Sequence, residues 1–155
     1  EKTMAQPRAE GEEFLLNDGI LAMMEKGAVF TPGAVKEWMD CGNPKITLET
    51  NTKMLDILTA EGNKLVTDDV VLENSKIIPP CYIGSGVVLK NATVGPHTAV
   101  GEGTQIENST LSNSLVQKHT IIQNAQLHGA MIGNHVKFDG AFDFVSIGDY
   151  SELSK

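Results

Sequence analysis

The stretch VGPHTAVGEGTQIE, residues 94–107, has one aliphatic residue in every six, and small or polar residues occupy most positions between them. The spacing continues in both directions along the chain, with steps of five or six residues. Grouped in threes, the aliphatic positions recur every 16 or 17 residues, which predicts a solenoid with three sides per coil. The positions are Val66, Leu72, Ile77, Ile83, Leu89, Val94, Val100, Ile106, Leu111, Val116, Ile122, Leu127, Ile132 and Phe138.

The five-residue units share a second feature, because their third residue is always asparagine or glycine. Both residues tolerate positive φ, which a corner shortened by one residue requires. These corner residues are Asn74, Asn91, Asn108, Asn113, Asn124, Gly129 and Gly140. We expect compact residues at the fifth position of the units to fill the corners from inside, namely Val70, Val87, Thr93, Thr98, Thr104, Thr110, Thr120 and Val136.

An ordinary β-sandwich is the alternative fold. Its strands would alternate apolar and polar residues with a period of two, between turns spaced about 8 to 12 residues apart. Residues 66–138 show a period of five or six instead, so the pattern favours the solenoid.

Composition narrows the class of protein. The chain has 155 residues, a net charge of −8 and no run of lysine and arginine, which argues against nucleic acid and membrane surfaces as partners. Its two cysteines, Cys41 and Cys81, fit a reducing compartment, and no apolar run has membrane-spanning length, so we expect a cytoplasmic protein. Because the chain begins with Glu1 and a polar stretch, we expect a fragment whose residues 1–13 are a flexible polar segment.

The residues before the solenoid predict two helices and a hairpin. Asn17 is the expected N-cap of a helix over residues 18–26 that ends at Gly27. Asn43 and Pro44 are the expected N-cap and first residue of a second helix, which runs to about residue 60. Between the helices, VFTPGAVKEWMD predicts two short strands around a Pro-Gly turn. We expect this segment to cover the open end of the solenoid.

The repeat units resemble a known structural family. VGPHTA, VGEGTQ, IGSGVV and IGNHVK are similar to the hexapeptide repeat of left-handed parallel β-helices, from residue 66 to about residue 138, and IGDYSE from Ile147 matches as a late unit. The resemblance implies a mainly β fold, with a left-handed β-helix domain of about five coils over residues 66–155. A small α/β segment precedes it. The left hand comes from this resemblance alone, because general sterics favour right-handed crossovers.

A second resemblance concerns function. FLLNDGILAMMEKGAVF, followed by EWMDCGNPKITLETNTKML, resembles the end of the catalytic domain of sugar-1-phosphate nucleotidyltransferases, especially glucose-1-phosphate thymidylyltransferase-like proteins. Trp38, Asp40, Gly42 and Pro44 match the W-x-D-x-G-x-P segment of that family, and IPPCYIG at residues 78–84 resembles the opening of its β-helices. The resemblance implies that residues 14–62 are the remnant of a catalytic domain and that the chain is the C-terminal part of the enzyme.

Such an enzyme makes a nucleotide sugar and pyrophosphate from a nucleoside triphosphate and a sugar-1-phosphate, with Mg²⁺ as cofactor. By motif match, Asp40 is the one candidate ligand of Mg²⁺, and the alternative is an aspartate that hydrogen-bonds the turn before the second helix. The family's Gly-rich nucleotide-binding loop is absent, and the glycines at residues 84–86 fit corners of the solenoid better. We therefore expect the fragment alone to be inactive and to hold no cofactor, although the parent protein is an enzyme.

Two other enzyme classes use such solenoids. Hexapeptide acyltransferases place a catalytic histidine near a protruding loop, and residues 66–138 leave no room for one. A hydratase similar to gamma-class carbonic anhydrases needs three metal-binding histidines. By the repeat, His119 and His135 stack about 5 Å apart, whereas His128 lies on another face.

The last hypothesis is not enzymatic. In the family that the chain resembles, the β-helix mediates oligomerisation or carries a regulatory site, and flat sheet faces suit symmetric packing. We therefore expect a homo-oligomer assembled through the solenoid. We also expect a structural ladder along one corner, formed by Asn74, Asn91, Asn108 and Asn124.

Overall fold

The computed structural model describes residues 15–140 and 146–153, and side-chain burial for residues 15–140 and 146–151. The predicted flexible segment 1–13 lies outside the described residues. The chain divides into two compact units, Glu1–Trp38 and Met39–Lys155. Neither described helix has the length and the hydropathy that a bilayer-spanning helix needs.

The first unit contains helix α1 (Leu16–Glu25). It begins two residues before the predicted start, because Leu15 rather than Asn17 is the N-cap, so that prediction is wrong. The carboxylate of Asp18 accepts a hydrogen bond from the Leu15 N–H at 3.3 Å, which satisfies a free donor at this helix end. The predicted end is confirmed, because Gly27 follows the helix with a φ of 87°.

The predicted hairpin is also wrong, because residues 28–42 contain no strand. Two-residue hairpins favour turns with positive φ at the first central residue, whereas Pro32 holds its φ near −65°. Gly33 does not adopt a positive φ either. The Pro-Gly pair therefore does not form the turn of a hairpin, and no two strands pair across it.

Helix α2 (Pro44–Ala60) opens the second unit and confirms the second predicted helix. The Asn43 side chain accepts a hydrogen bond from the Ile46 N–H at 3.0 Å, and Pro44 occupies the first turn. Proline costs the helix no hydrogen bond at this position, because a backbone N–H in the first turn has no partner within the helix. Glu61 ends the helix, and Gly62 follows with a φ of 77°.

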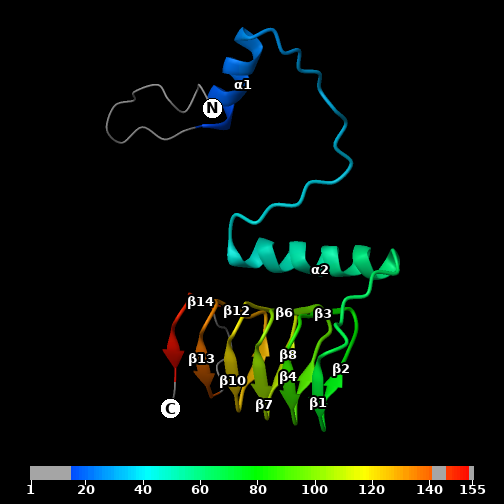
Figure 1. Ribbon diagram of the computed structural model, residues 1–155, viewed down its shortest axis with the longest axis vertical. Coiled ribbons are helices and arrows are strands. Elements are labelled where there is room, and N and C mark those ends of the chain that lie inside the picture. The colour runs from blue at the N-terminus through cyan, green and yellow to red at the C-terminus, as the bar shows by residue number, and fades with distance from the viewer. Residues whose placement is uncertain (1–14, 141–145, 154–155) are drawn as a thin grey trace. The chain divides into compact units, whose positions relative to one another are not determined.

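Residues 66–153 form a parallel β-solenoid of about four turns (Figure 1). Its walls are a six-stranded sheet with the order β1-β4-β7-β10-β13-β15, a five-stranded sheet with the order β14-β12-β9-β6-β3, and a four-stranded sheet with the order β11-β8-β5-β2. The strands are β1 (Val71–Glu73), β2 (Lys76–Ile77), β3 (Cys81–Ile83), β4 (Val88–Lys90), β5 (Thr93–Val94), β6 (Thr98–Val100), β7 (Gln105–Glu107), β8 (Thr110–Ser112), β9 (Leu115–Val116), β10 (Ile121–Gln123), β11 (Gln126–His128), β12 (Met131–Ile132), β13 (Lys137–Asp139), β14 (Ser146–Ile147) and β15 (Glu152–Leu153).

The predicted register of the aliphatic positions is confirmed. Leu89 lies opposite Ile106, and Ile106 lies opposite Ile122, on three consecutive coils. All three side chains are at most 1% exposed. Ile147 pairs with Ile132, as the late unit requires. The interior therefore consists of three columns of aliphatic side chains, one behind each wall.

The corner prediction is confirmed in part. All seven predicted corner residues have positive φ, for example 47° at Asn91 and 71° at Gly129. Thr93 and Thr110, however, do not fill corners, because their side chains point out of the four-stranded sheet. In a five-residue unit the shortened corner turns the fourth residue inward instead. These inward residues are Ser75, Ala92, Ser109, Ser114, Ala125 and Ala130.

The inward hydroxyl groups connect consecutive coils. The Ser109 hydroxyl donates to the Glu107 carbonyl at 2.6 Å and accepts from the Ala125 N–H, one coil later, at 3.0 Å. Ser114 bonds the Ser112 carbonyl and the Ala130 N–H in the same way. The strand ladder is interrupted at the corners, so these hydroxyls satisfy buried backbone groups there.

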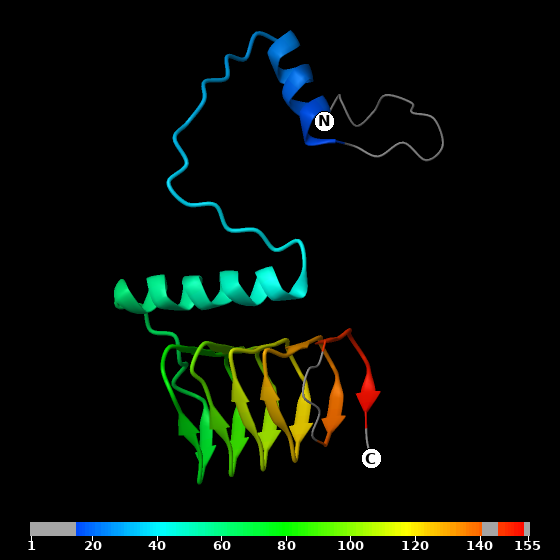
Figure 2. The ribbon, with the colours of Figure 1, turned by 180° about the vertical axis from the view of Figure 1, so that it is seen from behind.

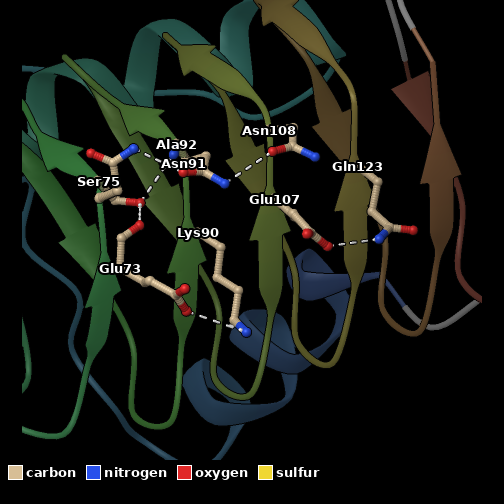
Figure 3. Close-up of polar contacts among 9 residues, drawn as sticks. Glu73, Ser75, Lys90, Asn91, Ala92, Glu107, Asn108 and Gln123 are labelled. Atoms are coloured by element: carbon tan, nitrogen blue, oxygen red, sulfur yellow. Dashed lines mark hydrogen bonds and ion pairs between the residues drawn. The ribbon is translucent and has the colours of Figure 1, made fainter.

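The predicted asparagine ladder is confirmed along one corner (Figure 3). The side-chain amide of Asn74 donates to Asn91 at 2.8 Å, and Asn91 donates to Asn108 at 3.2 Å. Asn108 donates to Asn124 at 3.4 Å. Each asparagine therefore supports both the positive φ of its corner and the contact with the next coil.

Helix α2 runs across the coils rather than over the end of the solenoid (Figures 1 and 2). The prediction that this segment covers the open end is therefore wrong for α2. Leu48 and Leu55 lie two helical turns apart on one face, and both are buried. The helix bonds His97 and Asn113, which occupy the corner between the four-stranded and five-stranded sheets on consecutive coils. The apolar face of α2 therefore packs along the side of the solenoid, over more than one coil.

Replacing Leu111 by alanine should lower the free energy of unfolding by about 2–5 kcal/mol, because Leu111 is fully buried in the middle of its column. Thr110→Ala, in the same strand but on the outer surface, is the matched control and should change it by less than about 0.5 kcal/mol. Urea unfolding followed by circular dichroism measures both values. Equal effects of the two substitutions would contradict the assigned interior.

Asn108→Ala should destabilise the protein by about 1–2 kcal/mol, because alanine resists the φ of 47° at this corner. Asn108→Gly should recover most of this loss, since glycine adopts the corner freely although it lacks the ladder hydrogen bonds. The same unfolding experiment ranks the three proteins. A glycine variant that recovers none of the loss would show that the lost ladder hydrogen bonds, and not the backbone conformation, dominate.

Candidate functional site

Asp40 lies in the turn before α2, in the second unit. Its carboxylate accepts a hydrogen bond from the Cys41 N–H at 2.7 Å, and its carbonyl accepts one from the Thr50 hydroxyl at 2.6 Å. This is the geometry expected of an aspartate that orders the turn. No cluster of three potential metal-ligating side chains occurs among the described residues. The role of Asp40 as a Mg²⁺ ligand stays a prediction.

The histidines occupy two separate places. His119 and His135 stack with ring centroids 5.2 Å apart, as predicted, and the Tyr150 ring continues the column 4.8 Å from His135. His128 lies on β11, in another wall, where its Nδ1 is 2.9 Å from the Ser112 hydroxyl. Stacked rings present their faces to each other rather than their nitrogen lone pairs. These three histidines therefore do not converge on one point.

A groove of about 870 Å³ lies between α2 and the solenoid corner beside it. This volume lies in the range of small-molecule sites. Lys45 and Lys53 line its helix side, and Ser112 and His128 line its solenoid side. The remaining lining residues are Leu48, Glu49, Thr52, Pro96, His97, Asn113 and Gly129.

Polar pairs fix the helix along this groove. The His97 Nε2 lies 2.9 Å from the carboxylate of Asp56, and the Thr52 hydroxyl donates to the side chain of Asn113 at 3.1 Å. His97 and Asp56 are 30% and 57% exposed, so their attraction is weakened by solvent. The groove therefore combines charged and apolar side chains, and hydrogen bonds between α2 and the solenoid hold its two walls together.

A second candidate surface is the outer side of the six-stranded sheet, which we call the six-stranded face. Two rows of side chains cross it at the outward positions of β1, β4, β7 and β10. Over these four strands the apolar row consists of Val71, Val88 and Ile121 with the neutral polar Gln105 among them, and the charged row consists of Glu73, Lys90, Glu107 and Gln123. On β13 the two rows continue with Lys137 and Asp139.

The charged row is internally paired, as Figure 3 shows. The Lys90 ammonium lies 3.4 Å from the carboxylate of Glu73, and the Gln123 amide donates to Glu107 at 2.9 Å. A shallow depression of about 90 Å³ lies between the rows around Gln105 and Glu107. The face is therefore flat, ordered and patterned in charge.

Among the described residues, Asp69 and Cys81 have shifted pKa values. The Ser85 hydroxyl, at 2.6 Å, is the main cause that holds the pKa of Asp69 below its ordinary value, and the Gly86 N–H at 2.9 Å adds to this effect. Burial raises the pKa of the Cys81 thiol, which donates to the Ile78 carbonyl at 2.9 Å. Cys81 is therefore a structural thiol rather than a nucleophile.

No protein-family profile matches the chain, and no curated protein matches its sequence. The resemblance to nucleotidyltransferases therefore rests on the motif residues Trp38, Asp40, Gly42 and Pro44.

The pair of His97 and Asp56 and the pair of Ser112 and His128 were missed in the sequence. The first joins residues 41 positions apart, from a helix and a coil, so no local spacing marks it. The second joins residues 16 positions apart, which is one coil. The repeat length therefore places residue 112 directly beside residue 128, and this signal was present in the sequence.

Ser85→Ala should move the pKa of Asp69 up toward its ordinary value of 3.8. Because the folded-state pKa is lowered, the ionised carboxylate stabilises the fold above the ordinary pKa, and this contribution disappears as the pH falls through the lowered pKa. The wild type should therefore exceed the variant in stability at about pH 6, and this difference should shrink as the pH falls below the ordinary pKa of 3.8. Carboxyl-carbon NMR titration measures the pKa, and Ser112→Ala should leave it unchanged. An unaltered pKa in the Ser85 variant would contradict the assignment.

Proposed function

We propose that this chain is the C-terminal region of a sugar-1-phosphate nucleotidyltransferase, with a left-handed hexapeptide-repeat solenoid of about five coils. In this proposal the solenoid serves self-association, and nucleotidyl transfer belongs to the rest of the parent enzyme, which is cytoplasmic. The order of elements supports the proposal. The W-x-D-x-G-x-P motif from Trp38 to Pro44 leads directly into α2, and α2 leads into the solenoid.

The apolar surface of residues 15–38 carries the proposal. Helix α1 contains no buried residue, and Leu16, Val29 and Trp38 are 81%, 88% and 80% exposed. Large apolar surfaces of this kind mark contacts with another folded body. A segment that ends a larger catalytic domain would bury these side chains against that domain.

The chemistry of nucleotidyl transfer also favours a division in which the solenoid serves self-association and the rest of the parent enzyme carries out the reaction. A phosphate oxygen of the sugar-1-phosphate attacks the α-phosphate of the nucleoside triphosphate, and pyrophosphate leaves. Cationic groups must take up the charge that develops on the phosphate oxygens, and Mg²⁺ supplies part of this when it is bound. In the described part of this chain, Asp40 is the residue that matches the family's metal-binding motif, and its carboxylate bonds its own turn.

The solenoid supports self-association in a different way. Its walls are flat, and α2 lies against the corner between two of them. The six-stranded face lies opposite that corner and presents an apolar row beside a charged row. Such a surface suits a symmetric contact between identical chains.

The proposal predicts two results for the 155-residue chain. Light scattering at increasing concentration should give a mass above the 16.7 kDa of one chain. Incubation with each nucleoside triphosphate, glucose-1-phosphate and Mg²⁺ should release no pyrophosphate, whereas the same chain joined to a nucleotidyltransferase catalytic domain should release it. A monomeric mass at all concentrations would refute self-association, and pyrophosphate release by the chain alone would refute the division of roles.

A further inference from the structure

The six-stranded face is the wall of the solenoid farthest from α2. The helix bonds His97, between β5 and β6, and Asn113, between β8 and β9. Both residues lie at the corner shared by the four-stranded and five-stranded sheets. In a three-walled prism the remaining wall lies opposite that corner, so α2 leaves the six-stranded face open.

The two rows on this face differ in chemistry. In the apolar row, Val71 is 52% exposed, and Val88 and Ile121 are half-buried. In the charged row, charge alternates along the coils as Glu73, Lys90 and Glu107, followed by the neutral Gln123 and by Asp139 on β13. Two copies of such an alternating row can pair when they run in opposite directions. If one copy is displaced by one coil, each charge lies opposite an unlike charge of the other copy.

Symmetry limits how two such faces meet. A two-fold axis parallel to the strands reverses the order of the coils but keeps each row opposite the same row of the second copy. An axis along the solenoid would instead place the charged row against the apolar row, which would leave charges without partners. The chemistry of the rows therefore favours the first axis.

The charge pattern also selects the position of that axis. An axis through the coil of Lys90 would place Lys90 against Lys90 of the second copy, and an axis through the coil of Glu107 would oppose two glutamates. An axis midway between these coils places Lys90 opposite Glu107 of the second copy, twice by symmetry. It also places Val71 opposite Ile121, Val88 opposite Gln105 and Glu73 opposite the neutral Gln123, so no like charges face each other over these four coils. Lys137 and Asp139 of β13 lie beyond this overlap.

We propose that two copies of this chain pair through the six-stranded face, about a two-fold axis parallel to the strands and midway between the coils of Lys90 and Glu107. This rests on the self-association proposed above and assigns it to one surface. The Gln123 amide, 2.9 Å from Glu107, and the Glu73 carboxylate, 3.4 Å from Lys90, hold the two charged groups in place for the contact. The depression around Gln105 and Glu107 lies opposite Val88 of the second copy.

The size of the overlap sets the expected strength. Four strands at ~4.8 Å spacing, and a wall ~15 Å wide, give roughly 300 Å² per copy. A standard stable interface covers about 800 Å² per partner, so this contact alone gives a weak dimer that forms at high concentration. The ion pairs make it sensitive to salt.

Charge reversal with mixing tests the pairing. Lys90→Glu places two pairs of negative charges in the interface, and Glu107→Lys places two pairs of positive charges there. Each variant alone should dimerise roughly tenfold more weakly than the wild type. In a one-to-one mixture, each interface between the two variants again contains two unlike pairs. Sedimentation velocity up to about 500 µM should show dimers recovered in the mixture.

Lys118→Glu and Glu102→Lys are the matched controls. These residues form a similar exposed ion pair, 3.2 Å apart, between consecutive coils, and they lie in turns rather than on the six-stranded face. The controls change the net charge by the same amounts, so they report any effect of overall charge. Neither control, nor their mixture, should alter dimerisation.

The outcomes separate this inference from the broader proposal. Recovery in the mixture of the Lys90 and Glu107 variants, without an effect of the controls, supports the pairing. Self-association that none of the variants alters would overturn the assigned face while leaving the oligomeric role intact. A wild-type chain that stays monomeric throughout would overturn both.

Discussion

Every coil of this solenoid depends on its neighbours having apolar side chains at the same positions. A coil of 16 or 17 residues cannot enclose a core, so Leu89 is buried only because Ile106 covers it, and Ile106 only because Ile122 does. For the side chains to stack in this way, the chain must turn its corners at equivalent positions in every coil. Residues with positive φ at the corners meet that demand, and the serine and threonine hydroxyls inside them replace the missing strand hydrogen bonds.

The repeat made most of the solenoid predictable, because residues at equivalent positions of the repeat have the same environment in every coil. The aliphatic columns and the asparagine corners follow from that rule. The rule failed where a unit is shorter by one residue. There the fourth residue points inward, so Ser109 and not Thr110 fills the corner. The residues before the solenoid have no repeat, so their structure was predicted from local signals alone. Asn17 was a possible N-cap, but the hydrogen bond of Asp18 to the Leu15 N–H places the start of the helix earlier. The Pro-Gly pair suggested a hairpin, but its backbone geometry does not suit a two-residue hairpin turn.

The candidate surfaces were less predictable than the fold. The position of α2 depends on Leu48 and Leu55, whose spacing marks an apolar stripe but does not say which part of the solenoid it contacts. The groove follows from that contact, so its lining joins residues with no common motif. The rows of the six-stranded face could have been derived from the register, since outward neighbours also recur with the repeat. Asp40 illustrates the opposite case, because a motif match alone does not distinguish a ligand from a residue that orders a turn.

The corner beneath α2 absorbs a difference in coil length. Val94 and Val100 are six residues apart, whereas Leu111 and Val116, which pair with them on the next coil, are five apart. The strands on both sides stay aligned, so a residue can be lost or gained here without disturbing the rest of the fold. Evolution can therefore lengthen the chain at this corner more cheaply than elsewhere, and any loop acquired there would emerge beside the groove.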